Sequence, residues 1–289
     1  SGPGGAAAGG TIGGDQGSGT VTVSNGATMA VSSVGATSGW PGFTIGSRGG
    51  TGALNIQSGA VMTVDGTGVT GGTGPGFTLG NAGTGTLNVT GGSSLLHITA
   101  NPFFGAGFTV GGNNNGVGTM TVEEEASVLI TGSSGRSGIV LGSNPGSRGT
   151  LNVATGATVT LHATSAAANV NIGRGGTGSV TVTGGGTSVL QDALTEPAEL
   201  NLWIGFDAGS DGTLTIQDGA VWTLNGTAPG ARPNMLVGRA AGSTGTLEIK
   251  NGAELTFNRG LTTTAGCCVT VGQLGHGILR ITGGGRLTI

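Results

Sequence analysis

The acidic side chains are the residues of this sequence whose spacing comes closest to that of a catalytic or metal site. Asp207, Asp211 and Asp218 are close in sequence, and Glu123–Glu125 is the densest charge in the chain. Paired carboxylates can act as general acid and base on a glycosidic bond, and adjacent carboxylates can attract a cation. However, Asp211 and Asp218 are expected at opposite ends of one strand, and strand alternation would turn Glu124 away from its neighbours. We interpret both sets as solvated residues.

Histidine and cysteine offer no alternative chemistry. His97, His162 and His276 are widely separated, so spacing alone does not assemble them into a metal site. Cys267 and Cys268 are adjacent, and neighbouring Cα atoms lie about 3.8 Å apart across a trans peptide. This distance is short of the range of about 4.4–6.8 Å that disulfides prefer. We expect two free, partly buried thiols, and we predict no catalytic residues, no metal, no cofactor and no enzyme activity.

Threonine pairs of the form Thr-x-Thr suggest a third kind of surface. On a flat solenoid face, a regular threonine array can order water and bind ice. Threonine is also a favourable outward-facing residue of any strand, and Glu248 and Arg280 interrupt the array. The pairs are Thr20 with Thr22, Thr119 with Thr121, and Thr213 with Thr215.

The composition excludes several classes of protein. The 289 residues include 67 glycines and 8 prolines, which would indicate disorder if no period were present. Only 8% of the residues are charged and the net charge is −3, without a basic stripe, so nucleic acid is not an expected partner. No apolar run approaches the roughly 18 residues of a membrane helix, so we expect no membrane insertion by this segment.

A period of about 33 residues runs through the chain in two anchors, each of which recurs nine times. The first anchor is a glycine, a small residue, and then two apolar residues separated by one other residue. It begins at Gly19, Gly52, Gly85, Gly118, Gly149, Gly178, Gly212, Gly245 and Gly277. The second is an aliphatic residue followed by glycine, at Gly13, Gly46, Gly80, Gly111, Gly142, Gly173, Gly205, Gly238 and Gly272.

Each repeat predicts three short strands. In the second repeat they are 43–45, 53–56 and 60–64, with alternating apolar residues such as Leu54 and Ile56. The turn between the second and third strands carries glycine in eight repeats, which indicates a backbone position with positive φ. These glycines are Gly26, Gly59, Gly92, Gly156, Gly185, Gly219, Gly252 and Gly284, and the remaining repeat has Glu125 at this place.

Two architectures fit these strands. Turns such as 24–26 and 217–219 could close antiparallel hairpins, as in stacked hairpins or propeller blades. Nine three-stranded units fit a propeller poorly, and a parallel β-helix pairs each strand with its equivalent in the next repeat. We predict an all-β fold, a right-handed parallel β-helix of about nine coils, roughly 40 Å long. Residues 1–10 form a Gly/Ala-rich N-terminal segment, and residues 11–289 form a single solenoid.

The repeat resembles that of known secreted proteins. Segments such as 236–238, 245–249 and 252–253 resemble the repeat in passengers of bacterial autotransporters (type V secretion) and in some PEP-CTERM-associated proteins. This resemblance implies an extracellular or bacterial cell-surface location and a role in adhesion or surface structure. It brings no catalytic residues with it.

The predicted function is therefore that of a non-catalytic extracellular structural or adhesive β-solenoid, as an adhesin stalk or a fibre-forming subunit. Its expected partners are a second copy stacked end to end, neighbouring coils of a longer chain, and host or cell-surface glycans or proteins. The two alternatives are a polysaccharide-acting β-helix enzyme and an ice-binding threonine solenoid. The predicted contact loops contain Trp40, Pro41, Phe103, Phe104, Glu196 and Arg232.

Overall fold

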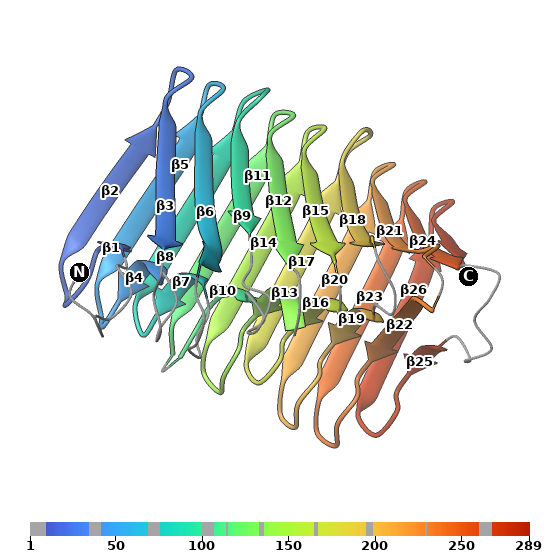
Figure 1. Ribbon diagram of the computed structural model, residues 1–289. Helices are drawn as coiled ribbons and strands as arrows, with labels where there is room; N and C mark the ends of the chain where they lie inside the picture. Colours follow the sequence, from blue (N-terminus) through green and yellow to red (C-terminus); the bar gives the residue numbers. More distant parts are fainter. Residues whose placement is uncertain are drawn as a thin grey trace.

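The chain is a parallel β-solenoid (Figure 1). The computed structural model describes residues 10–34, 42–68, 76–99, 107–113, 115–132, 136–164, 167–194, 199–228, 230–259 and 268–289. Within these ranges the chain forms strands and turns without any helix, and the strands make three sheets of nine. Each coil contributes one strand to each sheet, which confirms the predicted fold.

The strands recur in the order A, B, C along the chain, where the letters name the three sheets. Sheet A comprises β1 (Gly10–Ile12), β4 (Phe43–Ser47), β7 (Phe77–Asn81), β10 (Gly107–Val110), β13 (Arg136–Leu141), β16 (Ala167–Ile172), β19 (Glu199–Ile204), β22 (Arg232–Val237) and β25 (Cys268–Val271). Sheet B comprises β2 (Ser18–Val23), β5 (Thr51–Gln57), β8 (Thr84–Thr90), β11 (Val117–Glu123), β14 (Arg148–Ala154), β17 (Thr177–Thr183), β20 (Asp211–Gln217), β23 (Thr244–Lys250) and β26 (His276–Thr282). Sheet C comprises β3 (Thr28–Val34), β6 (Val61–Gly68), β9 (Leu95–Thr99), β12 (Ser127–Gly132), β15 (Thr158–Ala163), β18 (Ser188–Ala193), β21 (Val221–Gly226), β24 (Glu254–Arg259) and β27 (Arg286–Thr288).

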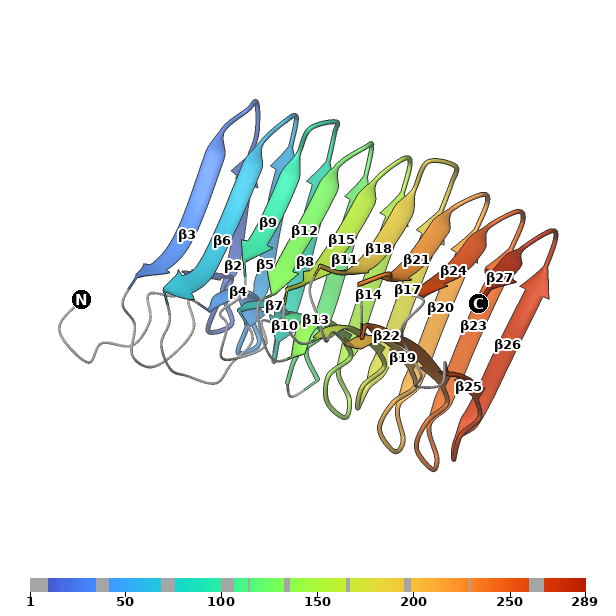
Figure 2. The same ribbon diagram turned by 45° about the vertical axis from the view of Figure 1, so that its right-hand side comes forward.

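Every strand pairs in parallel with its equivalent in the next coil (Figure 2). Leu54 of β5, for example, pairs with Val21 of β2 on one side and with Leu87 of β8 on the other. Consecutive strands of one coil belong to different sheets, although the turn between them has the local shape of a hairpin turn. The hairpin alternative is therefore wrong.

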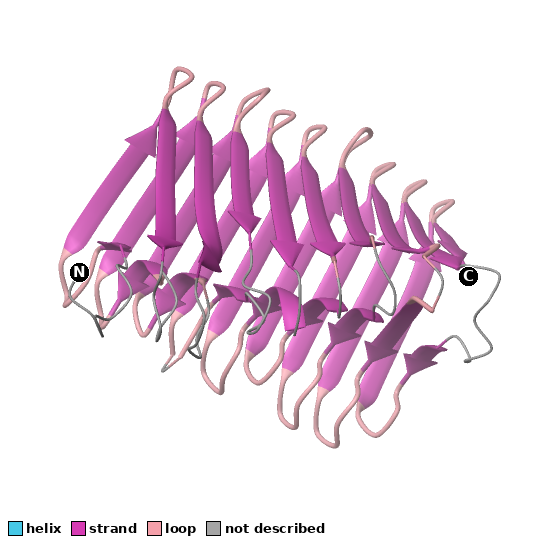
Figure 3. Ribbon diagram, in the orientation of Figure 1, coloured by secondary structure: helices cyan, strands magenta, loops and turns pink. Residues whose placement is uncertain are grey.

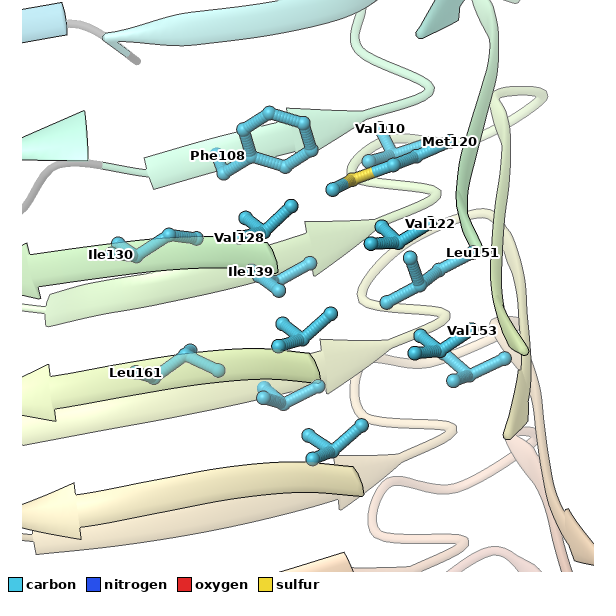
Figure 4. Close-up of a cluster of buried hydrophobic side chains, with 14 of the residues drawn as sticks. Phe108, Val110, Met120, Val122, Val128, Ile130, Ile139, Leu151, Val153 and Leu161 are labelled. Carbon is cyan, nitrogen blue, oxygen red and sulfur yellow. The ribbon is translucent and has the colours of Figure 1, made fainter. Parts of the chain in front are cut away.

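Apolar side chains from all three sheets fill the interior as ladders (Figure 4). Phe108 and Ile139 come from sheet A, Met120 from sheet B, and Val128 and Ile130 from sheet C. In most strands every second residue is buried, and the predicted core residues of the second repeat have no exposed surface; these are Leu54, Ile56, Met62 and Val64. Burying one such side chain stabilises the fold by roughly 1.5–3 kcal/mol.

The turns from sheet B to sheet C confirm positive φ at six of the eight predicted glycines: Gly26, Gly59, Gly156, Gly219, Gly252 and Gly284. Two successive residues share this conformation; Asp218 has φ 57° and Gly219 has φ 78°. The Ala220 N–H closes the turn by donating to the Gln217 carbonyl at 3.2 Å. Glu125 adopts the same conformation, with φ 62°, without being a glycine.

The prediction is wrong at Gly92 and Gly185. These coils have one residue more between the anchor glycine and the start of the sheet C strand: Gly85 to Leu95 and Gly178 to Ser188, compared with Gly52 to Val61 in the common turn. The positive φ values fall on the flanking residues: Gly91 and Ser93 in the first case, Gly184 and Gly186 in the second. Because of the added residue, Gly92 and Gly185 no longer occupy the turn position that has positive φ.

The corner from sheet A to sheet B explains both glycine anchors. A Cβ added at Gly205 would lie 2.2 Å from the Thr244 carbonyl oxygen of the next coil. A Cβ at Gly212 would lie 2.2 Å from the Ile172 carbonyl oxygen of the preceding coil. Backbone packs directly on backbone at this corner, so neither position has space for a side chain.

Substitutions at three glycines of one coil can therefore measure the cost of steric contact separately from the cost of positive φ. Gly219→Ala adds only the cost of positive φ, since its nearest new contact would be 3.7 Å away, and we expect a loss of about 1 kcal/mol. Gly212→Ala forces the backbones apart and is expected to cost at least about 3 kcal/mol. Gly205→Ala combines both effects, since φ is 67° there. Urea midpoints followed by circular dichroism provide the comparison, and equal losses at Gly212 and Gly219 would contradict the steric explanation.

Candidate functional site

The outer face of sheet A forms one wall of a hollow of about 880 Å³. The turns that join sheet A to sheet B project beyond the sheet (Figure 3) and provide the second wall. Five successive coils each place one outward side chain on the first wall, namely Thr78, Thr109, Val140, Asn171 and Trp203. The second wall includes Asn81, Asn113, Asn144, Arg174, Asp207 and Arg239.

Strand alternation places the first wall. In β13 the side chains of Ile139 and Leu141 are buried in the core, so Val140 between them points outward. Because the strands pair in register, the equivalent residue of each coil also points outward. Val140 is therefore aligned with Asn171, and Asn171 with Trp203. The hollow therefore follows the axis of the rod, with one outward residue for each coil.

An aromatic pair and three charged residues lie at the end of the hollow nearer the C-terminus. Trp203 stacks on Phe206 with ring centroids 4.2 Å apart, and the Arg239 guanidinium carbon lies 4.1 Å from the Phe206 ring centre. Arg174 and Asp207 approach to 4.0 Å, and both are about half exposed. Because solvent screens such a pair, it contributes at most a fraction of a kcal/mol.

Two residues that line the hollow each have a buried polar atom without a hydrogen-bond partner: Asn171 Oδ1 and Trp203 Nε1. The Asn171 residue is only 7% exposed, so water reaches it poorly. A buried polar group without a partner costs about 1–3 kcal/mol. One of these atoms accepts a hydrogen bond and the other donates one, and they sit on paired residues of neighbouring strands.

A ladder of asparagines runs beside this row. Asn201 donates to Asn169 Oδ1 at 2.7 Å, and Asn234 donates to Asn201 Oδ1 at 3.3 Å. Asn169 also lines the hollow. Sequence reasoning missed this ladder and the hollow beside it. The available signal was asparagine at the same strand position in three successive repeats.

The predicted contact residues are only partly described by the structure. Trp40, Pro41, Phe103, Phe104 and Glu196 lie outside the described residues. Arg232 is exposed, but it is the first residue of β22 and so does not belong to the connection that precedes this strand. Its assignment to a loop is therefore wrong. Cys267 is also outside the described residues, and Cys268 begins β25.

The structure separates the predicted threonine pairs. They lie on the outer face of sheet B in three coils that are not neighbours: Thr20 with Thr22 on β2, Thr119 with Thr121 on β11, and Thr213 with Thr215 on β20. Asn55 and Asn88 stand between the first two pairs and bond to each other at 2.8 Å. A regular two-dimensional threonine array is therefore interrupted near both ends, since Glu248 and Arg280 pair at 2.9 Å beyond the third pair.

The acidic residues do not converge. Asp211 and Asp218 lie at opposite ends of β20, about 23 Å apart along an extended strand, as predicted. Glu124 and Glu125 occupy a turn and are both exposed, so the strand alternation expected for them is wrong. No three His, Cys, Asp or Glu side chains come together as metal ligands within the described parts of the chain.

Asp218 belongs to a stack of polar turn residues at the corner between sheets B and C. Asn251 of the next coil donates to one of its carboxylate oxygens at 2.9 Å, and Thr183 of the preceding coil donates to the other at 2.9 Å. These two hydrogen bonds lower the pKa of Asp218, with a smaller contribution from Lys250.

In a comparison with known proteins, no protein-family model, no curated protein and no solved structure matches the chain. The resemblance to autotransporter passengers stays a prediction. The described residues include no helix long and apolar enough to cross a membrane.

The turn stack provides a test by pH titration. Because Asn251 stabilises the ionised carboxylate, Asn251→Gly should raise the pKa of Asp218 toward the usual value of about 3.9. Glycine suits the positive φ of 55° at this position, so the turn is kept. The stabilising effect in the parent chain is present above the unfolded pKa and disappears as the pH falls through the lowered folded pKa.

The measurement is an NMR titration of the Asp218 side-chain carboxyl. Asn258→Ala serves as the control, since it removes a comparable hydrogen bond, to Asn225 at 3.3 Å, without touching Asp218. An unchanged titration midpoint in Asn251→Gly would show that this hydrogen bond does not set the pKa.

Proposed function

We propose that this chain is a non-catalytic extracellular structural and adhesive β-solenoid, a segment of a bacterial surface or secreted passenger. The observation that carries the proposal is the continuity of the scaffold. One hydrophobic cluster runs from Ile12 to Phe257, and each sheet continues through nine strands. Such a rod holds a surface feature at a fixed distance and orientation, as a stalk or a fibre subunit must.

The hollow on sheet A gives the rod a surface for binding. Its walls are formed by strands and by turns whose ends are fixed in the sheets, so its shape is preorganised. Neutral polar and aromatic side chains predominate in it, together with Arg174, Asp207 and Arg239. This mixture suits a polar partner such as a surface glycan or protein.

The arrangement of the carboxylates supports a non-catalytic role over the polysaccharide-acting alternative. Glycoside hydrolases hold two carboxyl groups about 5–9.5 Å apart. Asp211 and Asp218 are separated by the length of β20, far beyond that range. Asp207 lines the hollow, where its neighbour is Arg174 rather than a second acid.

The last coil has the apolar surface that a further coil would cover. Val271, Leu274, Ile281 and Ile289 are all exposed there, and the strands β25, β26 and β27 each have a partner on one side only. Unpaired strand edges with apolar neighbours favour association. The proposed partners of this end are neighbouring coils of a longer chain or a second copy stacked end to end.

Adhesion under flow tests the proposed function. Beads that carry the chain should be retained on cellulose or pectin films, or on bacterial cells, whereas beads that carry an unrelated globular protein should wash off. No reducing ends should be released from the films. Equal retention of both bead types would contradict adhesion, and reducing ends that disappear in Asp211→Asn would establish catalysis instead.

End-to-end association has a separate test by sedimentation at increasing concentration. Leu274 is 76% exposed in the last coil, and Leu274→Lys should reduce the association constant because it places a charge at the contact. Val117→Lys is the matched control, since Val117 is 38% exposed in the middle of the rod. A strict monomer in the parent chain, or equal effects of the two variants, would contradict stacking through this end.

A further inference from the structure

The hollow over sheet A has the same period as the rod. Neighbouring strands lie about 4.8 Å apart, so the five coils of the first wall span about 19 Å. The spacing of about 4.8 Å between neighbouring coils is close to the length that one pyranose adds to an extended polysaccharide. A chain of sugars laid along the hollow would therefore meet each coil at a similar place in its own repeat.

The unpartnered atoms of the hollow specify what the ligand must offer. Asn171 Oδ1 needs a donor and Trp203 Nε1 needs an acceptor, and the two residues pair across neighbouring strands. A hydroxyl group both donates and accepts, so adjacent hydroxyls on one sugar can satisfy both atoms once the two side chains turn toward the hollow, since neither atom is open to solvent in the structure. The gain is larger than for a solvated pair, because the partners are already removed from water.

The aromatic residues and the arginines fit the same class of ligand. Trp203 is only partly buried and lines the hollow together with Phe206. The apolar C–H face of a pyranose packs on such rings, while its hydroxyls reach outward. Arg239 and Arg174 supply donors for further hydroxyls or for a uronate carboxylate.

A peptide fits the hollow less well. Extended peptides gain affinity by adding a strand to an exposed sheet edge. Along this face the strands β7, β10, β13, β16 and β19 are each paired on both sides, so their backbone groups are already used. Recognition along the hollow therefore depends on side chains, most of which are neutral amides, hydroxyls and rings.

We propose that the hollow over sheet A is a binding site for an extended oligosaccharide, in which Asn171 and Trp203 bind the hydroxyls of one sugar. This inference depends on the proposed function only in treating the chain as a binding rod. It adds the class of ligand and the two residues that bind it.

Calorimetric titration with two hexasaccharides tests the site, with neutral cellohexaose and acidic hexagalacturonate as the probes. The parent chain should bind at least one of them. Asn171→Leu and Trp203→Phe should each weaken that binding by at least about tenfold. Neither variant should lower the melting temperature, since leucine and phenylalanine remove an unpartnered polar atom and keep most of the side-chain volume.

Trp222→Phe is the matched control, because Trp222 is fully buried and its Nε1 donates to Gln191 Oε1 at 3.1 Å. That variant should lower the melting temperature and leave the affinity unchanged. If Arg239→Gln weakens the binding of hexagalacturonate alone, the acidic sugar is the preferred ligand.

The proposal is overturned if neither hexasaccharide binds at about 10 mM, or if Asn171→Leu and Trp203→Phe bind as the parent does. It is also overturned if both variants lose stability together with binding, as structural residues would. Failure of the adhesive function is a different result. If beads that carry the Trp203→Phe chain adhere as the parent beads do, adhesion does not use this site. If the chain binds a hexasaccharide but the beads are not retained, the site stands and the adhesive function is contradicted.

Discussion

The backbone contact between successive coils at the corner from sheet A to sheet B determines the spacing of the whole structure. A Cβ at Gly46 or Gly85 would lie about 2 Å from a carbonyl oxygen of a neighbouring coil, so only glycine fits there. The two glycines of each repeat hold the corner tight and fix where the strands of the next coil begin. The parallel register follows from that start, and the core ladders follow from the register.

The same constraint decides where chemistry can be placed. Most inward positions of the described strands carry the apolar ladders, with Gln191 as a polar exception that bonds to Trp222. The outward residues of sheet A do not fill the core, so they can differ from coil to coil. They change from Thr109 through Val140 to Asn171 and Trp203. A uniform scaffold therefore presents a varied row, as a binding surface requires.

The sequence predicts the features that repeat and misses those that depend on neighbouring coils. Alternation in residues such as Leu54 and Ile56 identifies the strands and the core, because burial imposes a period of two. Gly92 shows the limit, since one added residue moves the positive φ to its neighbours. The repeat anchors place Asn171 and Trp203 at the same position, two residues before an anchor glycine. The hollow itself was not predictable, because strand alternation does not specify how far the turns of its second wall project. Nothing in their local sequence indicates that their polar atoms lack partners.

The unpartnered atoms are the strongest reason to regard the hollow as functional. The row that contains Asn171 and Trp203 also contains Val140 and Leu236, which shows that the scaffold accepts aliphatic side chains at this position. An aliphatic residue at 171 would avoid the cost of a buried amide oxygen without a partner. The fold therefore does not demand the polar atom. Natural proteins retain such costs where binding uses them, and a ligand hydroxyl is the group that would turn this cost into affinity.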